Sequence, residues 1–417
     1  MKINNIKDVS EYQLCCGCGV CAYLYPNDIE MVDIPCLGRR PNFLCDKATV
    51  TFDQALQVCP GFRVSHPLDQ PNRKELISSL SHSWGPVLEI WEVHAADPEI
   101  RYKGSSGGAI TAISLYCLEQ GEMTGVLHVT AAPKRPYLNR TVVSTTRQSL
   151  LQGTGSRYSP ASPCEKLGEI EKSDCLNVIV GKPCDINAVQ NVRALKKQLD
   201  TKIGLTIACF CAGTPSTNGT LEMLRQMKVD DLGQLAGLRY RGKGWPGKTT
   251  AEPLDKSGKY KFKDLAYENS WGDILQKYRQ WRCYICPDHT GEFADLAVGD
   301  PWYKERDEND IGRSLVIVRT TQGKKILYDA VAKGYLVAEK MEAWVLPASQ
   351  PNLKETRAKL WGQLVALKLL RAPCPFYSGF HLSHNWWSHL SVIQKIRSIL
   401  GTMKRVFKKN LKRKQEF

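Results

Sequence analysis

Four cysteines lie within seven residues near the start of this chain, in the sequence Cys-Cys-Gly-Cys-Gly-Val-Cys from Cys15 to Cys21. Cys15, Cys18 and Cys21 are each separated by two residues, a spacing typical of the loops that hold a 4Fe-4S cluster. The glycines between them allow the tight turns that such a loop needs. We therefore expect these three cysteines to bind a 4Fe-4S cluster, with Cys16 as an additional thiol.

In the usual run a fourth cysteine precedes a proline, but here Tyr25 precedes Pro26. A fourth ligand therefore has to come from elsewhere. Cys59, which is followed by Pro-Gly, supplies the missing Cys-Pro pair, and we expect it to be the fourth ligand. Cys36 and Cys45 lie between the run and Cys59 and are alternatives. Zinc also accepts four thiolates, so a zinc site is the alternative to a cluster.

The chain has 417 residues, which is enough for two or three compact domains. Its start is polar and has no apolar leader, and no run approaches the roughly 18 apolar residues of a membrane span. Sixteen cysteines without a secretory leader favour a reducing compartment and metal or cluster binding over a disulfide framework. We therefore expect a cytoplasmic protein.

The formal net charge of +15 is unevenly distributed. Residues 395–417 contain nine Lys and Arg and one Glu, so this tail carries +8 and the remainder of the chain +7. A mildly basic body suits an acidic protein partner or a phosphate-bearing cofactor. It does not indicate a specific nucleic-acid partner.

Three parts are expected along the chain: a loop-rich cluster module over residues 1–80, an α/β domain over 81–345 and a helical extension over 346–417. Strands are predicted in the second part at Leu88–Ala95, Leu176–Val180, Ile203–Ala208 and Arg313–Arg319. Helical patterns follow several of these strands, including one that runs to about Leu199. This alternation predicts a mostly parallel or mixed sheet with functional loops at the strand ends. Residues 230–312 look irregular.

Two segments rich in small residues lie in the α/β part. Lys-Gly-Ser-Ser-Gly-Gly-Ala at 103–109 precedes a predicted helix, and Gln-Gly-Thr-Gly-Ser-Arg-Tyr occupies 152–158. Small residues at a helix start expose backbone N–H groups at the positive end of the helix dipole, which favours a phosphate. Together the two segments predict a phosphate site for a nucleotide or flavin, whereas each alone could be a tight connection.

A second group of cysteines follows later in the sequence. Cys184 and Cys211 each come just after a predicted strand, and Cys283 and Cys286 form a Cys-x2-Cys pair before a proline. Half of a zinc knuckle or a redox dithiol are alternatives, but no second Cys-x2-Cys pair follows at knuckle spacing. These four cysteines together provide enough thiolates for a second 4Fe-4S cluster.

The tail predicts a basic amphipathic helix. Apolar residues recur at helical spacing from Ile396 to Leu411, basic residues occupy the other faces, and Trp386 and Trp387 precede them. Such a helix fits an anionic membrane surface. The alternative is a helix whose apolar face packs on the body while its charges are only solvated.

Eight short elements in one order make residues 10 to 345 resemble the family of beta subunits of coenzyme F420-reducing hydrogenases and formate dehydrogenases. They are Cys-x-Gly-Cys-Gly-x-Cys at 15–21, Cys-Pro-Gly at 59–61, Ser-Ser-Gly-Gly at 105–108, Gly-Lys-Pro-Cys at 181–184, Cys-x-Gly-x-Pro-Ser at 211–216, Tyr-Arg-Gly-x-Gly-Trp-Pro at 240–246, Arg-Cys-x-x-Cys-x-Asp at 282–288 and Ala-Asp-x-x-x-Gly-Asp-x-Trp at 294–302. The basic tail lies outside the resemblance.

The resemblance implies an oxidoreductase with FAD and 4Fe-4S clusters. It also implies a fold of an N-terminal ferredoxin-like 4Fe-4S module followed by an α/β flavin-binding domain and a C-terminal helical basic tail. Reduced ferredoxin, or a similar electron-carrier protein, would deliver electrons through two clusters and FAD to an organic small-molecule acceptor. The first alternative is a beta subunit that exchanges electrons with coenzyme F420. The second alternative is a zinc-bound adaptor without enzymatic activity.

On this interpretation the first cluster is held by Cys15, Cys18, Cys21 and Cys59, and the second by Cys184, Cys211, Cys283 and Cys286. The residues expected to hold the flavin are Ser105, Ser106, Gly107, Gly108, Gly153, Gly155, Ser156, Tyr158 and Lys182. No particular catalytic residue is predicted. The tail adds an expected peripheral contact with the inner membrane surface.

Overall fold

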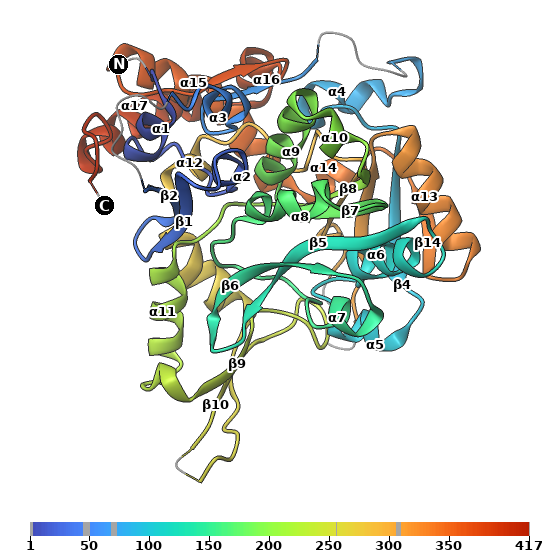
Figure 1. Cartoon of the computed structure of the whole chain (residues 1–417). Helices are drawn as coiled ribbons and strands as arrows, with labels where there is room; N and C mark the ends of the chain where they lie inside the picture. The colour runs from blue at the N-terminus through green and yellow to red at the C-terminus, as the bar shows by residue number, and fades with distance from the viewer. Residues whose placement is uncertain (1–2, 45–50, 68–72, 256, 306–309, 417) are drawn as a thin grey trace.

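An eight-stranded mixed sheet forms the centre of the computed structural model, which describes residues 3–44, 51–67, 73–255, 257–305 and 310–416 (Figure 1). From edge to edge the strands are β14 (Leu336–Met341), β4 (Glu89–Ala95), β13 (Ser314–Val318), β12 (Leu296–Gly299), β8 (Ile203–Cys209), β7 (Leu176–Gly181), β5 (Met123–Ala132) and β6 (Arg135–Ser144). β12, β8, β7 and β5 are parallel neighbours, and the outer pairings are antiparallel. The expected α/β fold with a mixed sheet is confirmed.

Apolar side chains cover both faces of this sheet, as its near-continuous apolar strands require. Along β13, Leu315 and Ile317 contribute to one buried cluster, whereas Val316 and Val318 contribute to the other. Helices α6 (Ala109–Glu119) and α13 (Thr321–Ala332) pack against the second face, and α9 (Pro183–Leu195) packs against the first. The sheet is therefore the middle layer of three.

Ten short helices connect the larger elements of the described chain. They are α1 (Ile6–Glu11), α2 (Val20–Leu24), α3 (Asp53–Val58), α4 (Ser78–Trp84), α5 (Pro98–Lys103), α7 (Arg147–Leu151), α8 (Leu167–Glu171), α10 (Lys197–Asp200), α12 (Trp281–Tyr284) and α14 (Val345–Ser349). The helix expected to run to Leu199 is interrupted, because Lys196 leaves the helical conformation between α9 and α10. This break lets Leu199 turn into the buried core.

The region expected to be irregular, residues 230–312, contains a small antiparallel sheet. Its strands are β9 (Leu235–Arg239), β10 (Thr249–Pro253) and β11 (Lys263–Leu265), and α11 (Thr217–Gln226) packs beside it. β9 and β10 extend away from the main sheet at the bottom of Figure 1. The sequence did not show these strands because each is short and interrupted by polar residues.

The N-terminal and C-terminal segments pack together. β1 (Ile29–Ile34) pairs with β2 (Gly38–Phe43), and β15 (Phe376–Ser378) from the extension pairs with β3 (Arg63–Ser65). One buried cluster joins residues of α1 and α2 to residues of the C-terminal helices α15 (Pro351–Leu369) and α17 (Val392–Lys408). Between them in the sequence, α16 (Leu382–His389) packs against α15. The bounds of the three predicted parts and the ferredoxin-like nature of the first segment stay predictions.

Candidate functional site

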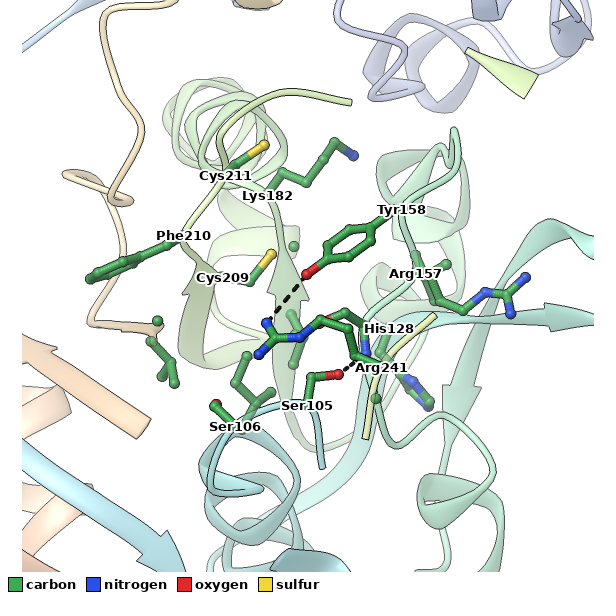
Figure 2. Close-up of a pocket in the computed structure, with 18 of the residues that line it drawn as sticks. Ser105, Ser106, His128, Arg157, Tyr158, Lys182, Cys209, Phe210, Cys211 and Arg241 are labelled. Carbon is green, nitrogen blue, oxygen red and sulfur yellow. Dashed lines mark hydrogen bonds between the residues drawn. The ribbon is translucent and has the colours of Figure 1, made fainter. Parts of the chain in front are cut away.

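A cavity of about 320 Å³ opens at the carboxyl ends of β7, β8 and β12. The residues that directly follow these strands line it: Lys182 after β7, Phe210 and Cys211 after β8, and Asp300 after β12. Figure 2 shows Lys182, Cys209 and Cys211 on one side of this space and Ser105, Tyr158 and Arg241 on another. The loops at the ends of parallel strands are where open α/β sheets bind ligands.

The two segments of small residues meet at this cavity. The Ser105 hydroxyl accepts a hydrogen bond of 2.6 Å from the backbone N–H of Ser156, which fixes one loop on the other. Gly108 has a positive φ of 73° and precedes the first turn of α6, so the start of that helix opens on the cavity. Eight of the nine residues expected to hold a flavin line the cavity.

Gly107 is the exception, because it packs between backbone segments of the main sheet. A Cβ on Gly107 would lie 2.7 Å from the Val93 carbonyl oxygen, and its N–H donates to the Ser314 hydroxyl at 2.9 Å. Its backbone therefore lets α6 approach the sheet closely.

Lys182 brings a buried positive charge to the cavity wall. Its Nζ lies 2.6 Å from the Asp185 carboxylate, which also accepts from the Lys182 backbone N–H at the start of α9. Burial lowers the pKa of Lys182, but the neighbouring Asp185 carboxylate raises it by more, so the net pKa lies well above its usual value. Lys182 is therefore charged at neutral pH.

A second buried ion pair forms the opposite wall, between Arg241 and Asp300. The guanidinium donates to both carboxylate oxygens, at 2.7 and 2.9 Å, and to the Tyr158 hydroxyl at 3.3 Å. It lies over the rings of Tyr267 and Trp302, at 4.9 and 5.7 Å from their centroids. The motifs that contain Arg241 and Asp300 are visible in the sequence, but no pattern in it shows that they meet, so the sequence predicts no role for Arg241.

Arg157, a cation of the second small-residue segment, is committed to the protein framework. Its guanidinium donates to the Leu238 carbonyl oxygen at 2.7 Å and to Asn139 Oδ1 at 2.8 Å. Figure 2 shows the head group directed away from Lys182 and Arg241. Arg157 therefore stabilises the loop, and the phosphate contacts expected here would come from backbone N–H groups and hydroxyls.

The N-terminal cysteines surround a much smaller cavity of about 10 Å³. Cys15, Cys16, Cys18, Cys21 and Cys59 all line it, together with Pro60. Burial raises the pKa of Cys59 well above its usual value, and the nearby thiols of Cys18, Cys15 and Cys21 raise it further. Thiols that raise the pKa of a neighbour in this way need a bound cation to become thiolates together.

Of the two alternatives for the fourth ligand, Cys36 lies away from this cavity. Cys36 is exposed at the turn between β1 and β2, and Cys45 lies outside the described residues.

The backbone N–H of Gly17 donates to the Cys15 sulfur at 3.3 Å. Hydrogen bonds of this kind stabilise and tune cluster thiolates.

The later cysteines also approach one another. Burial raises the pKa of Cys211 well above its usual value, and the neighbouring Cys283 and Cys184 raise it further. Burial likewise raises the pKa of Cys286 to about 12, with Cys184 and Cys283 adding to the effect. The four cysteines expected to hold a second cluster therefore lie within electrostatic reach of one another.

Gly213 explains how two of these loops come so close. Its φ is +125°, and a Cβ there would lie 3.1 Å from the Cys283 Cβ and 2.7 Å from the Arg279 Cδ. The next residue, Thr214, donates its backbone N–H to the Cys283 sulfur at 3.3 Å. Only glycine allows this approach without displacing Cys283.

Cys16 links the two sets of cysteines. It lines the N-terminal cavity, and its hydrogen bond with Cys184 is the largest of the effects that raise the pKa of Cys184. Cys211 in turn lines the large cavity. A succession of sulfur atoms therefore runs from the N-terminal cavity to the large one.

No group of three or more His, Cys, Asp or Glu side chains in the described part of the chain is spaced to hold a single metal ion. A cubane distributes its four thiolates over four iron atoms, so its ligand sulfurs lie farther apart than the ligands of one zinc ion. Buried thiols around a common cavity, with backbone N–H groups donating to sulfur, fit a cluster.

None of the helices described has the length and apolarity needed to cross a bilayer.

Two family descriptions match most of the α/β part. Residues 90–168 match the N-terminal region of the beta subunit of coenzyme F420 hydrogenase/dehydrogenase, and residues 177–343 match the C-terminal region of the same beta subunit. These ranges together cover more than half of the chain and include both small-residue segments, Lys182, Arg241 and the second set of cysteines.

Individual proteins named as subunits of F420 enzymes are also similar to this chain. The coenzyme F420 hydrogenase subunit beta of Methanosarcina barkeri is 25% identical over 62% of this chain and 84% of the relative. The F420-dependent formate dehydrogenase 1 subunit beta of Methanococcus maripaludis is 26% identical over 67% of this chain and 66% of the relative. A subunit of the F(420)H(2) dehydrogenase of Methanosarcina mazei is 24% identical over 87% of this chain and 91% of the relative.

A solved structure shares the fold. A chain of the F420-reducing NiFe hydrogenase complex from Methanosarcina barkeri superposes with a TM-score of 0.53 at 21% identity, covering 68% of this chain and 94% of that one.

Proposed function

Because this chain belongs to the family of coenzyme F420 hydrogenase/dehydrogenase beta subunits, whose members are parts of oxidoreductases, we propose that it transfers electrons between iron–sulfur clusters and coenzyme F420. The observation that carries this proposal is the succession of cysteines between the two cavities. The F420 alternative is favoured over the interpretation with an organic acceptor, because the matched relatives are named as F420 enzymes.

The residues of the large cavity fit a cofactor with a phosphate and a planar ring system. The start of α6 and the loop at 153–156 offer backbone N–H groups and hydroxyls, and Tyr158, Tyr267 and Trp302 offer flat aromatic surfaces. When bound, clusters supply single-electron steps and a flavin supplies the conversion to two-electron transfer. We propose FAD here and two 4Fe-4S clusters at the two sets of cysteines.

The protein's own side chains then set the charge of the cavity. Lys182 Nζ holds a buried positive charge beside Cys209 and Cys211, which favours added negative charge in the cavity. Arg241 is fully engaged by Asp300, Tyr158 and the Pro246 carbonyl oxygen, so it fixes the wall and does not reach for a phosphate. The aromatic rings around it exclude water from this wall.

A complex with further subunits is the natural setting for such a chain, because the relatives above are named as subunits. A second candidate donor is ferredoxin, favoured by the body charge of +7, which suits an acidic carrier. We place the protein in the cytoplasm, since its cysteines need a reducing environment to stay free for clusters.

The experiment is an anaerobic assay in which reduced F420 is mixed with the purified protein and a viologen dye as the electron acceptor. We expect the visible band of oxidised F420 to appear together with reduced viologen. The same preparation is then given reduced ferredoxin in place of reduced F420. Electron transfer from ferredoxin with none from F420 would reject the F420 proposal and leave the ferredoxin interpretation in place.

A further inference from the structure

The C-terminal helix α17 turns its apolar side toward solvent. With about 100° between successive residues, Val392, Ile396, Leu400, Met403 and Phe407 fall within an arc of about 80°. Val392 is 69% exposed, Ile396 51%, Leu400 58% and Phe407 65%. Ile393, at the margin of this arc, is 61% exposed. An apolar stripe of this size on one helix marks a contact surface.

The opposite, more polar side of α17 is the one that packs on the protein. Ser398, Thr402 and Val406 are buried against α15, and the Trp386 indole N–H donates to the Ser398 hydroxyl at 3.1 Å. A Cβ on Gly362 of α15 would overlap the Ser398 hydroxyl oxygen, so the two helices meet at a glycine. This fit fixes the rotation of α17, and its apolar stripe cannot turn inward.

Basic side chains border the apolar stripe. Arg397, Lys404 and Lys408 follow it on one flank, are exposed, and have no ion-pair partner within the described ranges. On the other side Lys395 lies over the ring of Trp387, 4.6 Å from its centroid, and Trp387 is 64% exposed. Long basic side chains and tryptophan beside an apolar stripe are the features of helices that lie in a membrane interface.

We propose that α17 binds the surface of a membrane containing anionic lipids, with its axis in the plane of the interface and its apolar stripe among the acyl chains. The charge decides between this occupant and a second copy of the chain. Residues 395–417 carry +8, so two copies facing each other through α17 would bring like charges together, whereas anionic headgroups neutralise them. This inference does not depend on the proposed electron-transfer function.

Docking through α17 would also orient the molecule. Figure 1 shows α17 beside α1 and close to both termini, and Lys414 pairs with Asp8 of α1 at 2.6 Å. Val406 and Leu411 share a buried cluster with Cys21 and Cys59. The N-terminal cysteine cavity therefore lies on the membrane-facing side of the protein.

The test is co-sedimentation of the full-length protein with vesicles of phosphatidylcholine alone or of phosphatidylcholine with phosphatidylglycerol, at about 0.15 M salt. We expect sedimentation only with the anionic vesicles. The double variant Ile396→Asp/Leu400→Asp should weaken binding at least 10-fold, and so should Lys404→Glu/Lys408→Glu. All four side chains are exposed, so the folded state is retained and is checked by circular dichroism.

Two control variants place single changes of the same kind elsewhere on the surface. Tyr260→Asp, at a site that is 59% exposed, and Lys333→Glu, on an exposed residue after α13, should sediment like the wild type. Equal sedimentation of the wild type and the double variants would overturn the proposal. So would equal binding to neutral and anionic vesicles, or a dimer in solution that Ile396→Asp/Leu400→Asp abolishes.

Discussion

At the scale of single residues, the least expected feature is the ion pair of Arg241 and Asp300. Nothing in the sequence links Asp300 with Arg241. The two residues are 59 positions apart, and only the folded chain brings them to one wall. Eight of the nine residues predicted to hold the flavin lie at the cavity because the glycine-rich segments are local signals, whereas a pair of distant charges is not.

This pair leads to a prediction about stability. Asp300→Ala should lower the free energy of unfolding by about 3 kcal/mol, because it leaves the Arg241 guanidinium buried without its counter-charge. Urea denaturation measures the change. Glu222→Ala removes an exposed i,i+3 pair with Arg225 and should have little effect. An Asp300→Ala variant as stable as Glu222→Ala would show that the Arg241 charge is solvated.

A second residue-level prediction concerns pH. Burial lowers the pKa of His128 to about 4, from 6.5. The unfolded chain therefore binds a proton below about pH 6.5 that the folded chain does not bind until about pH 4, so stability falls as the pH falls through this range. Between pH 7.5 and pH 5 the wild type should lose about 2 kcal/mol of stability relative to His128→Asn.

Urea denaturation of the two proteins at both pH values measures this difference. The variant loses the hydrogen bond between His128 Nε2 and the Ser144 hydroxyl, 2.8 Å apart, at both pH values, so the change between them reports the titrating group. A difference in stability that does not change between the two pH values would mean that His128 titrates in the folded protein as it does in the unfolded chain.

At the scale of elements, four strands of the main sheet follow from their apolar runs, whereas β5, β6, β12, β14 and the small sheet of β9, β10 and β11 do not. Strands β4, β7, β8 and β13 coincide with the predicted runs because each supplies apolar side chains to the buried clusters. β9 to β11 are held by their pairing with one another and by packing on α11. Such strands are short and half polar, so their sequence resembles that of loops.

The close approach of two loops at Gly213 gives an element-scale prediction. Gly213→Ala should push the Cys211 loop away from Cys283 and cost the protein about half of its iron, since each 4Fe-4S cluster needs four thiolates. Cys283→Ser should have the same effect and leave the N-terminal cluster in place. Iron analysis of the purified variants measures both losses.

Gly334→Ala is the matched control for backbone strain. Gly334 also has a positive φ, of 76°, but nothing lies within 4 Å of the position its Cβ would take. The Gly334→Ala variant should keep all of the iron. Full iron content in Gly213→Ala and Cys283→Ser would remove Cys283 from the set of cluster ligands.

At the scale of the whole molecule, the first and last parts of the chain depend on each other. The sequence predicts a separate cluster module and a separate C-terminal extension, but Ile6 and Val9 share a buried cluster with Leu364 and Val406. No periodicity in the sequence could reveal contacts between residues about 400 positions apart. Removing α17 would therefore disturb the N-terminal segment, which is why point substitutions test the membrane surface better than truncation does.

The measurement that tests the central claim most directly is the content of iron, acid-labile sulfide and flavin in the full-length protein purified without oxygen. Two sets of four cysteines and one flavin cavity predict about eight irons, about eight sulfides and about one flavin per chain. About four irons would mean that one set of cysteines does not bind a cluster. Zinc in place of iron, without flavin, would contradict the account of an electron path from the N-terminal cysteines to the large cavity.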